Sequence, residues 1–124
     1  MIHGIGTDIV YIPRVLRILH KYGEKFLNRV YTKREIEAGS KCNSPEVRAR
    51  HFAKRFAAKE AFVKALGVGF NQNIRMKDIE VCNDIKGKPY IITSKNFIYQ
   101  NNTTHLSISD DKDYATAFVV IQLS

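Results

Sequence analysis

The fold is decided by residues 44–67, which read SPEVRARHFAKRFAAKEAFVKALG. This stretch holds the start signal, the body and the stop signal of one long helix. Ser44 can act as the N-cap and Pro45 as the first helical residue, because a proline there loses no hydrogen bond. Gly67, directly after Leu66, is a typical C-terminal stop. We therefore predict a single helix that fills this stretch.

Two strips of side chains run along the predicted helix. Glu60 and Lys64, one turn apart and flanked by alanines, would leave room for a charged ligand. The same order also suits a plain surface ion pair worth about 0.2–0.5 kcal/mol. Lys59 falls near the middle of the apolar stripe, and the pattern accounts for it only by snorkelling or by pairing across a subunit interface. The polar strip is Ala53, Ala57, Glu60 and Lys64, and the apolar stripe is Phe52, Phe56, Val63 and Leu66.

The remaining sequence predicts an α+β fold, with an antiparallel sheet packed against the long central helix. Gly4 and Gly6 permit a close backbone approach in the first strand. In chain order we expect a buried strand over residues 1–10; a helix from Pro13 to Tyr22 that Gly23 ends; a short helix opened by a capping box over residues 32–35 and closed by Gly39; the long helix; strands over 78–81 and 90–93; a short helix over 94–101; and a hairpin of 104–109 and 114–123 with 110–113 as its turn.

Length and composition bound the class of protein. A chain of 124 residues fits one domain, and we treat residues 1–124 as a single unit. No apolar run approaches the ~20 residues that a membrane span requires. The N-terminus lacks the basic region of a signal peptide. Cys42 and Cys82 have no motif spacing, and we interpret them as reduced thiols of a cytoplasmic protein.

The charge balance points to an anionic partner. The chain carries 20 basic and 12 acidic residues, a formal net charge of +8. Such a surface attracts polyanions, and nucleic acid is the usual first candidate. The sequence has no helix-turn-helix, zinc-finger or RNP pattern to support that candidate. An acidic protein or a phosphorylated small molecule would satisfy the same electrostatics, so charge alone leaves these alternatives open.

Asp8 closes an otherwise apolar strand, where a carboxylate loses hydration unless it is paired or bound to a cation. An aspartate that faces solvent or caps a turn is the plain alternative. If Asp8 and Glu60 converge, they form two hard oxygen ligands of the kind that Mg²⁺ takes together with waters and substrate phosphates. Lys64 would then add a positive charge that faces a phosphate. These residue types suit phosphoryl transfer.

Four segments of the chain, in their order and spacing, resemble the 4′-phosphopantetheinyl transferase family. They are IGTDIV at residues 5–10, FAAKEAFVK at 56–64, GKPY at 87–90 and HLSIS at 105–109. The short length and the position of Asp8 are similar to the small bacterial branch of that family, the holo-[acyl-carrier-protein] synthases. The resemblance runs essentially end to end, and residues 68–77 and 94–103 carry least of it.

The resemblance implies a reaction. The enzyme would transfer the 4′-phosphopantetheine group of coenzyme A to a serine of apo acyl carrier protein, in fatty acid biosynthesis, and release adenosine 3′,5′-bisphosphate. Asp8 and Glu60 would bind Mg²⁺, and Lys64 would contact the phosphates and assist the leaving group. Either Glu60 or a metal-bound water beside it would take the serine proton. The coenzyme-binding residues implied in the same way are Arg55, Lys64, Gly67, Pro89, His105 and Ser107.

Two features of the last hairpin limit what the resemblance carries over. His105 also fits a partly buried strand histidine that is hydrogen-bonded to its neighbours. Some members of the family have a second histidine a few residues later, where this chain reads Ser109-Asp110-Asp111. A role for that histidine is therefore not transferred. The small members of the family assemble as trimers with sites at subunit interfaces, so the resemblance implies a homotrimer.

The first short helix has one basic side, which suits an acidic partner. Acyl carrier proteins are acidic, and charge complementarity would attract one to this side. A solvated polar face opposite a packed one explains the same pattern without a partner. We expect coenzyme A and apo acyl carrier protein as partners, and neither nucleic acid nor membrane; a non-catalytic protein that binds either partner is a further alternative. The basic residues are Arg14, Arg17 and Lys21, opposite Ile12, Val15, Leu19 and Tyr22.

Overall fold

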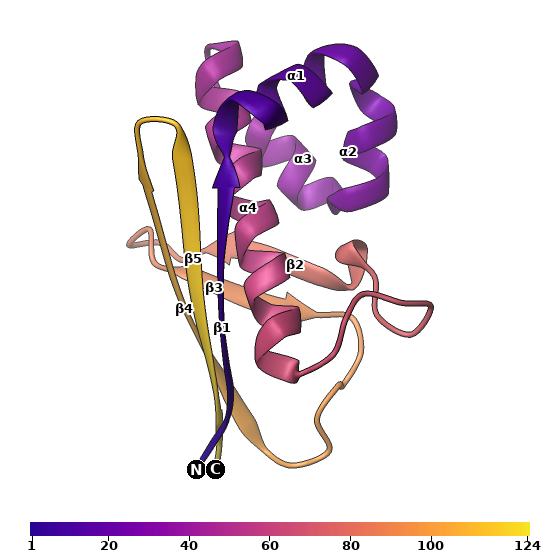
Figure 1. Cartoon of the computed structure of the whole chain (residues 1–124), viewed down its shortest axis with the longest axis vertical. Coiled ribbons are helices and arrows are strands. Elements are labelled where there is room, and N and C mark those ends of the chain that lie inside the picture. The colour runs from indigo at the N-terminus through magenta and orange to yellow at the C-terminus, as the bar shows by residue number, and fades with distance from the viewer.

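The computed structural model describes residues 1–124 without a gap. Helix α4 is the long central element, and the predicted α+β fold with an antiparallel sheet against that helix is confirmed, although the strands form two antiparallel sheets and not one (Figure 1). The elements are β1 (Ile2–Tyr11), α1 (Ile12–Tyr22), α2 (Glu24–Val30), α3 (Lys33–Ser40), α4 (Pro45–Leu66), the 3-10 helix η1 (Met76–Asp78), β2 (Ile79–Asn83), β3 (Pro89–Thr93), β4 (Asn102–Asp111) and β5 (Tyr114–Leu123).

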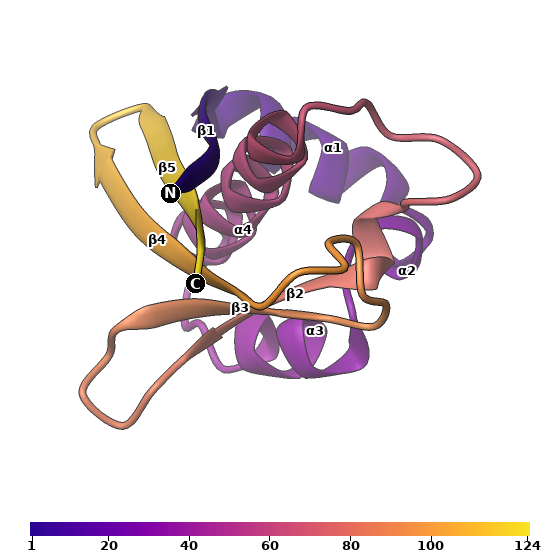
Figure 2. The same cartoon turned by 90° about the horizontal axis from the view of Figure 1, so that it is seen from below.

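Helix α4 has the ends that its sequence predicts. The Ser44 hydroxyl accepts a hydrogen bond from the Val47 N–H at 3.1 Å, and Gly67 takes the left-handed conformation, with φ at 85°, just past the last turn. Figure 2 shows the helix nearly end-on, with the three-stranded sheet on one side and the β2–β3 hairpin on another. Because several elements cover it, α4 is buried around most of its circumference. No helix combines the length and the apolar composition needed to cross a bilayer.

The three-stranded sheet has the order β1-β5-β4, and both of its pairings are antiparallel. The second sheet is the antiparallel β2–β3 hairpin. Since the first and last strands are neighbours, the two termini lie side by side at the end of the molecule opposite to α1, α2 and α3 (Figure 1). There the Leu123 N–H donates a hydrogen bond to the Met1 carbonyl at 2.7 Å.

Strand β1 lies directly against α4 at two glycines. A Cβ atom on Gly4 would stand 2.0 Å from the carbonyl oxygen of Ala65, and one on Gly6 would stand 1.9 Å from that of Ala61. Two strand residues rise about 6.6 Å and one helical turn about 5.4 Å, so these antiparallel contacts stay nearly in step. The next β1 residue on the same face is Asp8, which is therefore brought to the preceding turn of α4.

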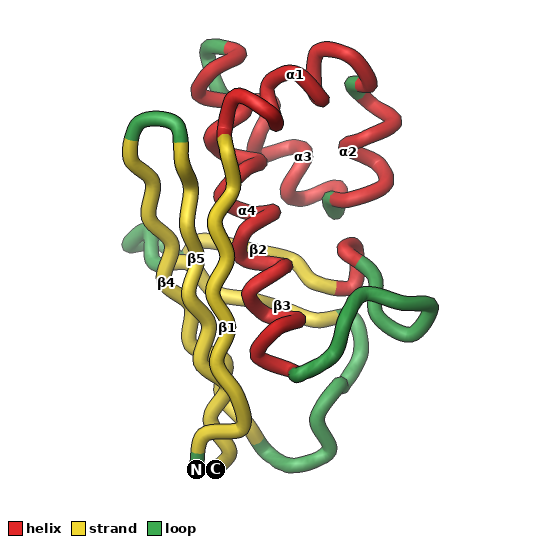
Figure 3. Tube along the Cα trace, in the orientation of Figure 1, coloured by secondary structure: helices red, strands yellow, loops and turns green.

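Helices α1, α2 and α3 close the other end of α4 (Figure 3). Buried side chains of α1 and α2, with Phe52 of α4, form one apolar cluster, and Ile36 of α3 packs against it. The inner side of the large sheet and the hairpin form a second cluster around Phe62. Val10, near the end of β1, contacts both clusters. The end of β1 and the middle of α4 thus meet at the boundary between the two parts of the core.

The predicted short helix at residues 94–101 is wrong. This segment forms a loop, and its two ends are tied to other elements by backbone hydrogen bonds. The Ser94 N–H donates to the Asp78 carbonyl at 2.9 Å, and the Ser124 N–H donates to the Asn101 carbonyl at the same distance. Long-range bonding therefore decides the conformation of these residues, and local propensity does not.

Three smaller differences concern the first 40 residues. Helix α3 opens with the predicted capping box at Thr32 but runs past Gly39. That glycine makes room for the Phe52 ring, which would stand 2.3 Å from a Cβ there. Helix α2 was not predicted, because its seven residues are too few for a clear apolar period. Tyr22 is exposed, not buried, since it is the last residue of α1.

Candidate active site

A hollow of about 420 Å³ opens where the end of β1, helices α1 and α2 and the middle of α4 meet. Asp8 from β1 and Glu60 and Lys64 from α4 contribute charged side chains to it, and Arg14 adds one from α1. The structure thus brings together the three charged residues that the sequence singled out. The rest of the lining is apolar and consists of Ile9, Val10, Val15, Ile18, Phe26 and Phe56.

Lys64 is paired with Asp8 and not with Glu60. Its Nζ donates to the Thr7 carbonyl at 2.9 Å and lies 3.2 Å from Asp8 Oδ1. The Asp8 side chain is only 17% exposed, so it is not the solvent-facing aspartate of the plain alternative. The expected surface pair between Glu60 and Lys64 is also absent. Glu60 is half-buried and accepts no hydrogen bond within the chain, which leaves its oxygens free.

The electrostatics of this cluster favour a bound cation. Burial raises the pKa of Glu60 above its ordinary value, the negative charge of Asp8 raises it further, and Lys64 opposes both effects. A raised carboxyl pKa means that the ionised form lacks compensating positive charge. Two carboxylates that share a hollow and keep free oxygens can obtain that compensation from a divalent cation.

The alanines of the predicted polar strip do not line this hollow. Ala53 is fully buried in the cluster formed with α1, α2 and α3, and Ala57 is fully buried in the other cluster. The prediction that they leave room for a ligand is therefore wrong. They leave room for protein, because a small side chain lets neighbouring elements approach α4. The open space lies beside Phe56 instead.

Arg55, a predicted coenzyme residue, lies on a different side of α4. Five residues separate it from Glu60, which is a rotation of about 140° around a helix. Its Nη2 donates to Asn83 Oδ1 at 2.9 Å, and Asn83 is paired in register with Pro89 at the start of β3. Its Nε is buried and has no hydrogen-bond partner. Burial lowers the pKa of Arg55, and Glu35 opposes that shift.

The other predicted coenzyme residues lie elsewhere on the chain. Gly67 caps the C-terminus of α4 and is exposed. His105 and Ser107 lie on the outer, exposed side of β4, where His105 Nε2 is 2.9 Å from Gln122 Oε1. His105 is therefore hydrogen-bonded to a neighbour, as its plain alternative expected, but is not partly buried. A single chain does not bring these residues to the carboxylate hollow.

The stretch that replaces the second histidine of some relatives has a structural partner. Asp110 Oδ2 lies 2.8 Å from Arg50 Nη1, and Asp110 Oδ1 lies 3.6 Å from Lys54 Nζ. Arg50 Nη2 also donates to the Lys112 carbonyl at 2.9 Å. These contacts tie the β4–β5 turn to α4, so Asp110 serves the position of the hairpin.

Lys59 is the charged residue whose place the sequence did not explain. It is fully buried and lies 2.7 Å from Glu35, which is also fully buried. Its side chain does not extend to the surface and needs no partner from another subunit, because all its hydrogen-bond partners lie within the chain. The capping-box position of Glu35 was visible in the sequence, but nothing there indicated that its carboxylate would meet Lys59.

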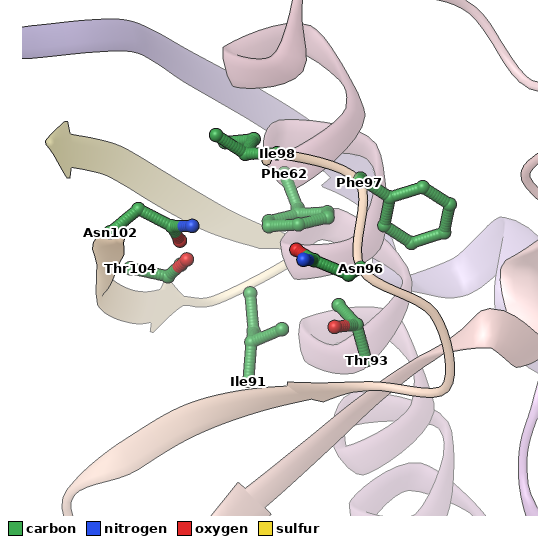
Figure 4. A pocket seen from close by; sticks show the side chains of 8 residues that line it. All are labelled: Phe62, Ile91, Thr93, Asn96, Phe97, Ile98, Asn102 and Thr104. Carbon is green, nitrogen blue, oxygen red and sulfur yellow. The ribbon is translucent and has the colours of Figure 1, made fainter. Parts of the chain in front are cut away.

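A second hollow, of about 220 Å³, lies between α4, β3, β4 and the loop that joins those strands (Figure 4). Its polar groups are the amides and hydroxyls of Asn96, Asn102, Thr93 and Thr104, and it has no titratable side chain. None of the predicted site residues lines it. Asp8, Glu60 and Lys64 all line the carboxylate hollow, which is therefore the candidate active site. The apolar lining of the second hollow consists of Phe62, Ile91, Phe97 and Ile98.

Comparisons with known proteins show the family of the chain. Residues 4–119 match the profile of the 4′-phosphopantetheinyl transferase superfamily. The chain belongs to that superfamily. This transferase is 70% identical over 121 residues to the holo-[acyl-carrier-protein] synthase of Wolbachia pipientis subsp. Culex pipiens, with 98% of each chain covered.

Solved structures extend the agreement to three dimensions. The transferase resembles the holo-(acyl-carrier-protein) synthase of Bacillus anthracis in complex with CoA (3′,5′-ADP), with a TM-score of 0.87, 40% identity and coverage of 100% and 99% of the two chains. It also resembles the Helicobacter pylori holo-[acyl-carrier-protein] synthase in complex with coenzyme A, with a TM-score of 0.83, 34% identity and coverage of 95% and 99%. The predicted family, and within it the holo-[acyl-carrier-protein] synthase type, is confirmed.

Proposed function

We propose that this transferase moves the 4′-phosphopantetheine group of coenzyme A to a serine of apo acyl carrier protein in fatty acid biosynthesis. Adenosine 3′,5′-bisphosphate is the leaving product. The observation that carries the proposal is the meeting of Asp8, Glu60 and Lys64 in one hollow with an apolar lining. The names of the similar proteins, and the coenzyme A complexes among them, support the same donor and acceptor.

The donor set of the hollow suits Mg²⁺. Asp8 and Glu60 offer carboxylate oxygens, and no third acidic, histidine or cysteine side chain joins them in a metal-sized group. Mg²⁺ typically takes one or two carboxylates and completes its shell with waters and substrate phosphates, so a two-carboxylate site fits it. When bound, the ion would offset the charge that develops on the transferred phosphoryl group.

The chain's own residues would then divide the work of the reaction. Lys64 is 54% exposed, so its ammonium can leave Asp8 and contact the phosphates, where it assists the departing bisphosphate. Glu60 is the group in the hollow with a raised pKa and free oxygens, which suits it to accept the proton of the incoming serine hydroxyl. The apolar lining would exclude bulk water from the reacting groups.

The remaining coenzyme contacts suggest an assembly. Arg55 and Pro89 lie at the hairpin side of α4, while His105 and Ser107 lie on the outer side of the large sheet. That outer side also exposes apolar residues: Ile5 is 60% exposed, Ile9 62% and Phe118 47%. We infer a homotrimer in which one subunit covers this surface of the next and the coenzyme lies between them. Sedimentation that gives a monomer at working concentration would contradict the trimer.

The carrier protein would dock beside the hollow. Arg14, Arg17 and Lys21 are all exposed on α1, and Arg14 lies at the hollow itself. An acidic carrier would be attracted by these charges, while the apolar lining next to them would receive its hydrophobic side chains.

Charge reversal tests this docking surface. Arg14→Glu together with Arg17→Glu should raise the KM for carrier protein at least about tenfold, because like charges now face each other, and should spare coenzyme A affinity. Steady-state kinetics and calorimetry measure the two quantities. Lys33→Glu with Lys41→Glu, two exposed residues at the ends of α3, is the matched control. Unchanged carrier-protein kinetics in the first variant would remove α1 from the docking surface.

The first experiment is intact-protein mass spectrometry of an apo acyl carrier protein incubated with the chain, coenzyme A and Mg²⁺. We expect a phosphopantetheine-sized mass gain that a chelator abolishes and that Asp8→Ala or Glu60→Ala slows by about 10²–10³. Activity that survives chelation would overturn the metal assignment. No gain with a folded chain would favour a binding protein, and a nucleic-acid module would then bind DNA or RNA in a salt-dependent manner that is indifferent to Glu60.

The cellular setting belongs to the same proposal. We infer that the enzyme works in the cytoplasm. Cys42 and Cys82 are both free thiols, as expected in a reducing compartment.

A further inference from the structure

The β2–β3 hairpin needs an attachment along one edge. It has only two strands, and β3 pairs with one edge of β2. An isolated two-stranded hairpin is marginally stable in water, and an unpaired strand edge leaves backbone groups unsatisfied. The other edge of β2 faces α3 and α4.

Lys59 and Glu35 occupy that edge. The Lys59 ammonium donates to the Ile79 carbonyl at 2.7 Å, and Glu35 Oε2 accepts from the Val81 N–H at 2.9 Å. Residues two apart in a strand direct their backbone groups to the same edge. The ion pair therefore supplies one donor and one acceptor to β2 where a third strand would supply them.

The same pair is fixed on its other sides. The Lys59 ammonium also donates to the carbonyls of Val30 at 3.0 Å and Met76 at 2.9 Å. Glu35 Oε1 lies 2.7 Å from Lys59 Nζ and accepts from the Thr32 N–H at 2.9 Å. Every polar atom of the pair is thus engaged, and both side chains have no exposed surface. Such a network has one geometry available to it.

The pair connects the carboxylate hollow with the hairpin side of α4, where the proposed coenzyme residues Arg55 and Pro89 lie. Lys59 directly precedes Glu60 on α4, and β2 ends at Asn83, which holds Arg55 and pairs in register with Pro89. A shift of the hairpin relative to α4 would therefore move Pro89 and the Asn83 side chain that holds Arg55, while Glu60 stays in place.

We propose that Lys59 and Glu35 are positioning residues for coenzyme A: they close the free edge of β2 and fix the hairpin relative to the carboxylates of the active site. This inference rests on the proposed coenzyme role of the hairpin. It assigns the two residues no contact with the substrate. They act by keeping the two parts of the coenzyme site in register.

The test uses two variants of the full chain. Glu35→Gln keeps the shape of the side chain. It places an amide N–H₂, itself a donor, opposite N–H groups that donate to the carboxylate in the unmodified chain. Glu35→Gln with Lys59→Met removes both charges together, so no buried charge is left uncompensated. We expect the KM for coenzyme A to rise about 10-fold to 100-fold in the double variant, with kcat and the carrier-protein KM changed less than about threefold.

A local readout separates positioning from general destabilisation. Hydrogen exchange of the Val81 amide and its hairpin neighbours should accelerate at least about tenfold, while amides of β1 and β5 keep their protection. Lys54→Met is the matched control, because Lys54 pairs from the same helix with Asp110 at 3.6 Å and does not touch β2. It should leave hairpin exchange and coenzyme A affinity unchanged.

The outcomes are distinguishable from failure of the proposed function. If the unmodified chain neither binds coenzyme A in calorimetry nor modifies a carrier protein, the proposed function fails and the inference falls with it. If the unmodified chain is active and the folded double variant binds coenzyme A with unchanged affinity, only the positioning role is overturned. Exchange that accelerates equally in β1, β5 and the hairpin would also overturn it.

Discussion

Two adjacent residues of α4 stand in opposite surroundings. Lys59 and its partner Glu35 are completely buried, and four acceptors surround the ammonium. Glu60, the next residue, is half-buried beside an open hollow and has no hydrogen-bond partner within the chain. Two charged residues that line the same hollow, Asp8 and Lys64, are paired with each other.

The difference shows how one helix can carry a structural and a functional charge side by side. Removing an ion from water is costly, and a closed network recovers that cost only when every polar atom finds a partner. A group that is to bind a ligand must keep capacity free instead. The pKa of Glu60, raised by burial and by Asp8, is the electrostatic sign of that free capacity.

The sharpest contrast lies between the two lysines that serve these surroundings. Lys59→Met should lower the free energy of unfolding by about 3–5 kcal/mol, because Glu35 is left charged and unpaired inside the protein. Lys64→Met should change it by less than about 1 kcal/mol, because the Lys64 side chain is 54% exposed and its pair is weak in water. Urea denaturation of both variants measures the difference.

At temperatures where both variants are folded, Lys64→Met should be the less active of the two, although it is the more stable. Lys64→Met removes the group proposed to contact the phosphates. Equal stability losses in the two variants would mean that the buried pair of Lys59 and the exposed pair of Lys64 contribute equally to folding, which would contradict the contrast between them.

A change at Gly6 should disturb the open cluster of Asp8, Glu60 and Lys64 and leave the buried cluster of Lys59 and Glu35 intact. Gly6→Ala puts a Cβ into the carbonyl of Ala61, and since backbone atoms cannot move aside easily, we expect a stability loss of about 1–3 kcal/mol. Strand β1 should then carry Asp8 away from Glu60, so transfer activity falls while the Val81 amide stays protected from exchange. Gly69→Ala is the control, because a Cβ there meets no atom within 4 Å. Loss of hairpin protection in Gly6→Ala would join the two clusters into one unit.

The smallest effect concerns the titration of Glu60. Since the negative charge of Asp8 raises the pKa of Glu60, Asp8→Asn should lower it, and carboxyl NMR titration measures the change. In the unmodified chain Glu60 gains its proton at a higher pH than an ordinary glutamate, so cation binding weakens earlier as the solution is acidified. The variant should hold Glu60 ionised to lower pH. A pKa that stays the same or rises would mean that Asp8 and Glu60 do not sense each other.

Much of the candidate site could be predicted because its residues were locally anomalous. Asp8 interrupts an apolar strand, and the motif around Glu60 and Lys64 resembles a family signature. The partner of Lys64 could not be predicted in this way. A helical projection places Lys64 beside Glu60, whereas the structure pairs it with Asp8, 56 residues away. The prediction for the buried alanines was wrong for the same reason, since a helical projection does not tell whether protein or ligand will fill the space beside a small side chain.

From the amino-acid sequence, the ends of α4, the capping box of α3 and the approximate places of the strands could be predicted, because they depend on residues within about four positions of one another. The family followed from four motifs in their order along the chain. The predicted burial of the first strand was wrong, since Ile2, Ile5 and Ile9 are exposed. The contact of Lys59 with Glu35, 24 residues earlier, and the loop conformation of residues 94–101 became apparent only in the folded chain. Those outcomes depend on which distant backbone groups remain unsatisfied once the elements have packed, and no local pattern contains that information.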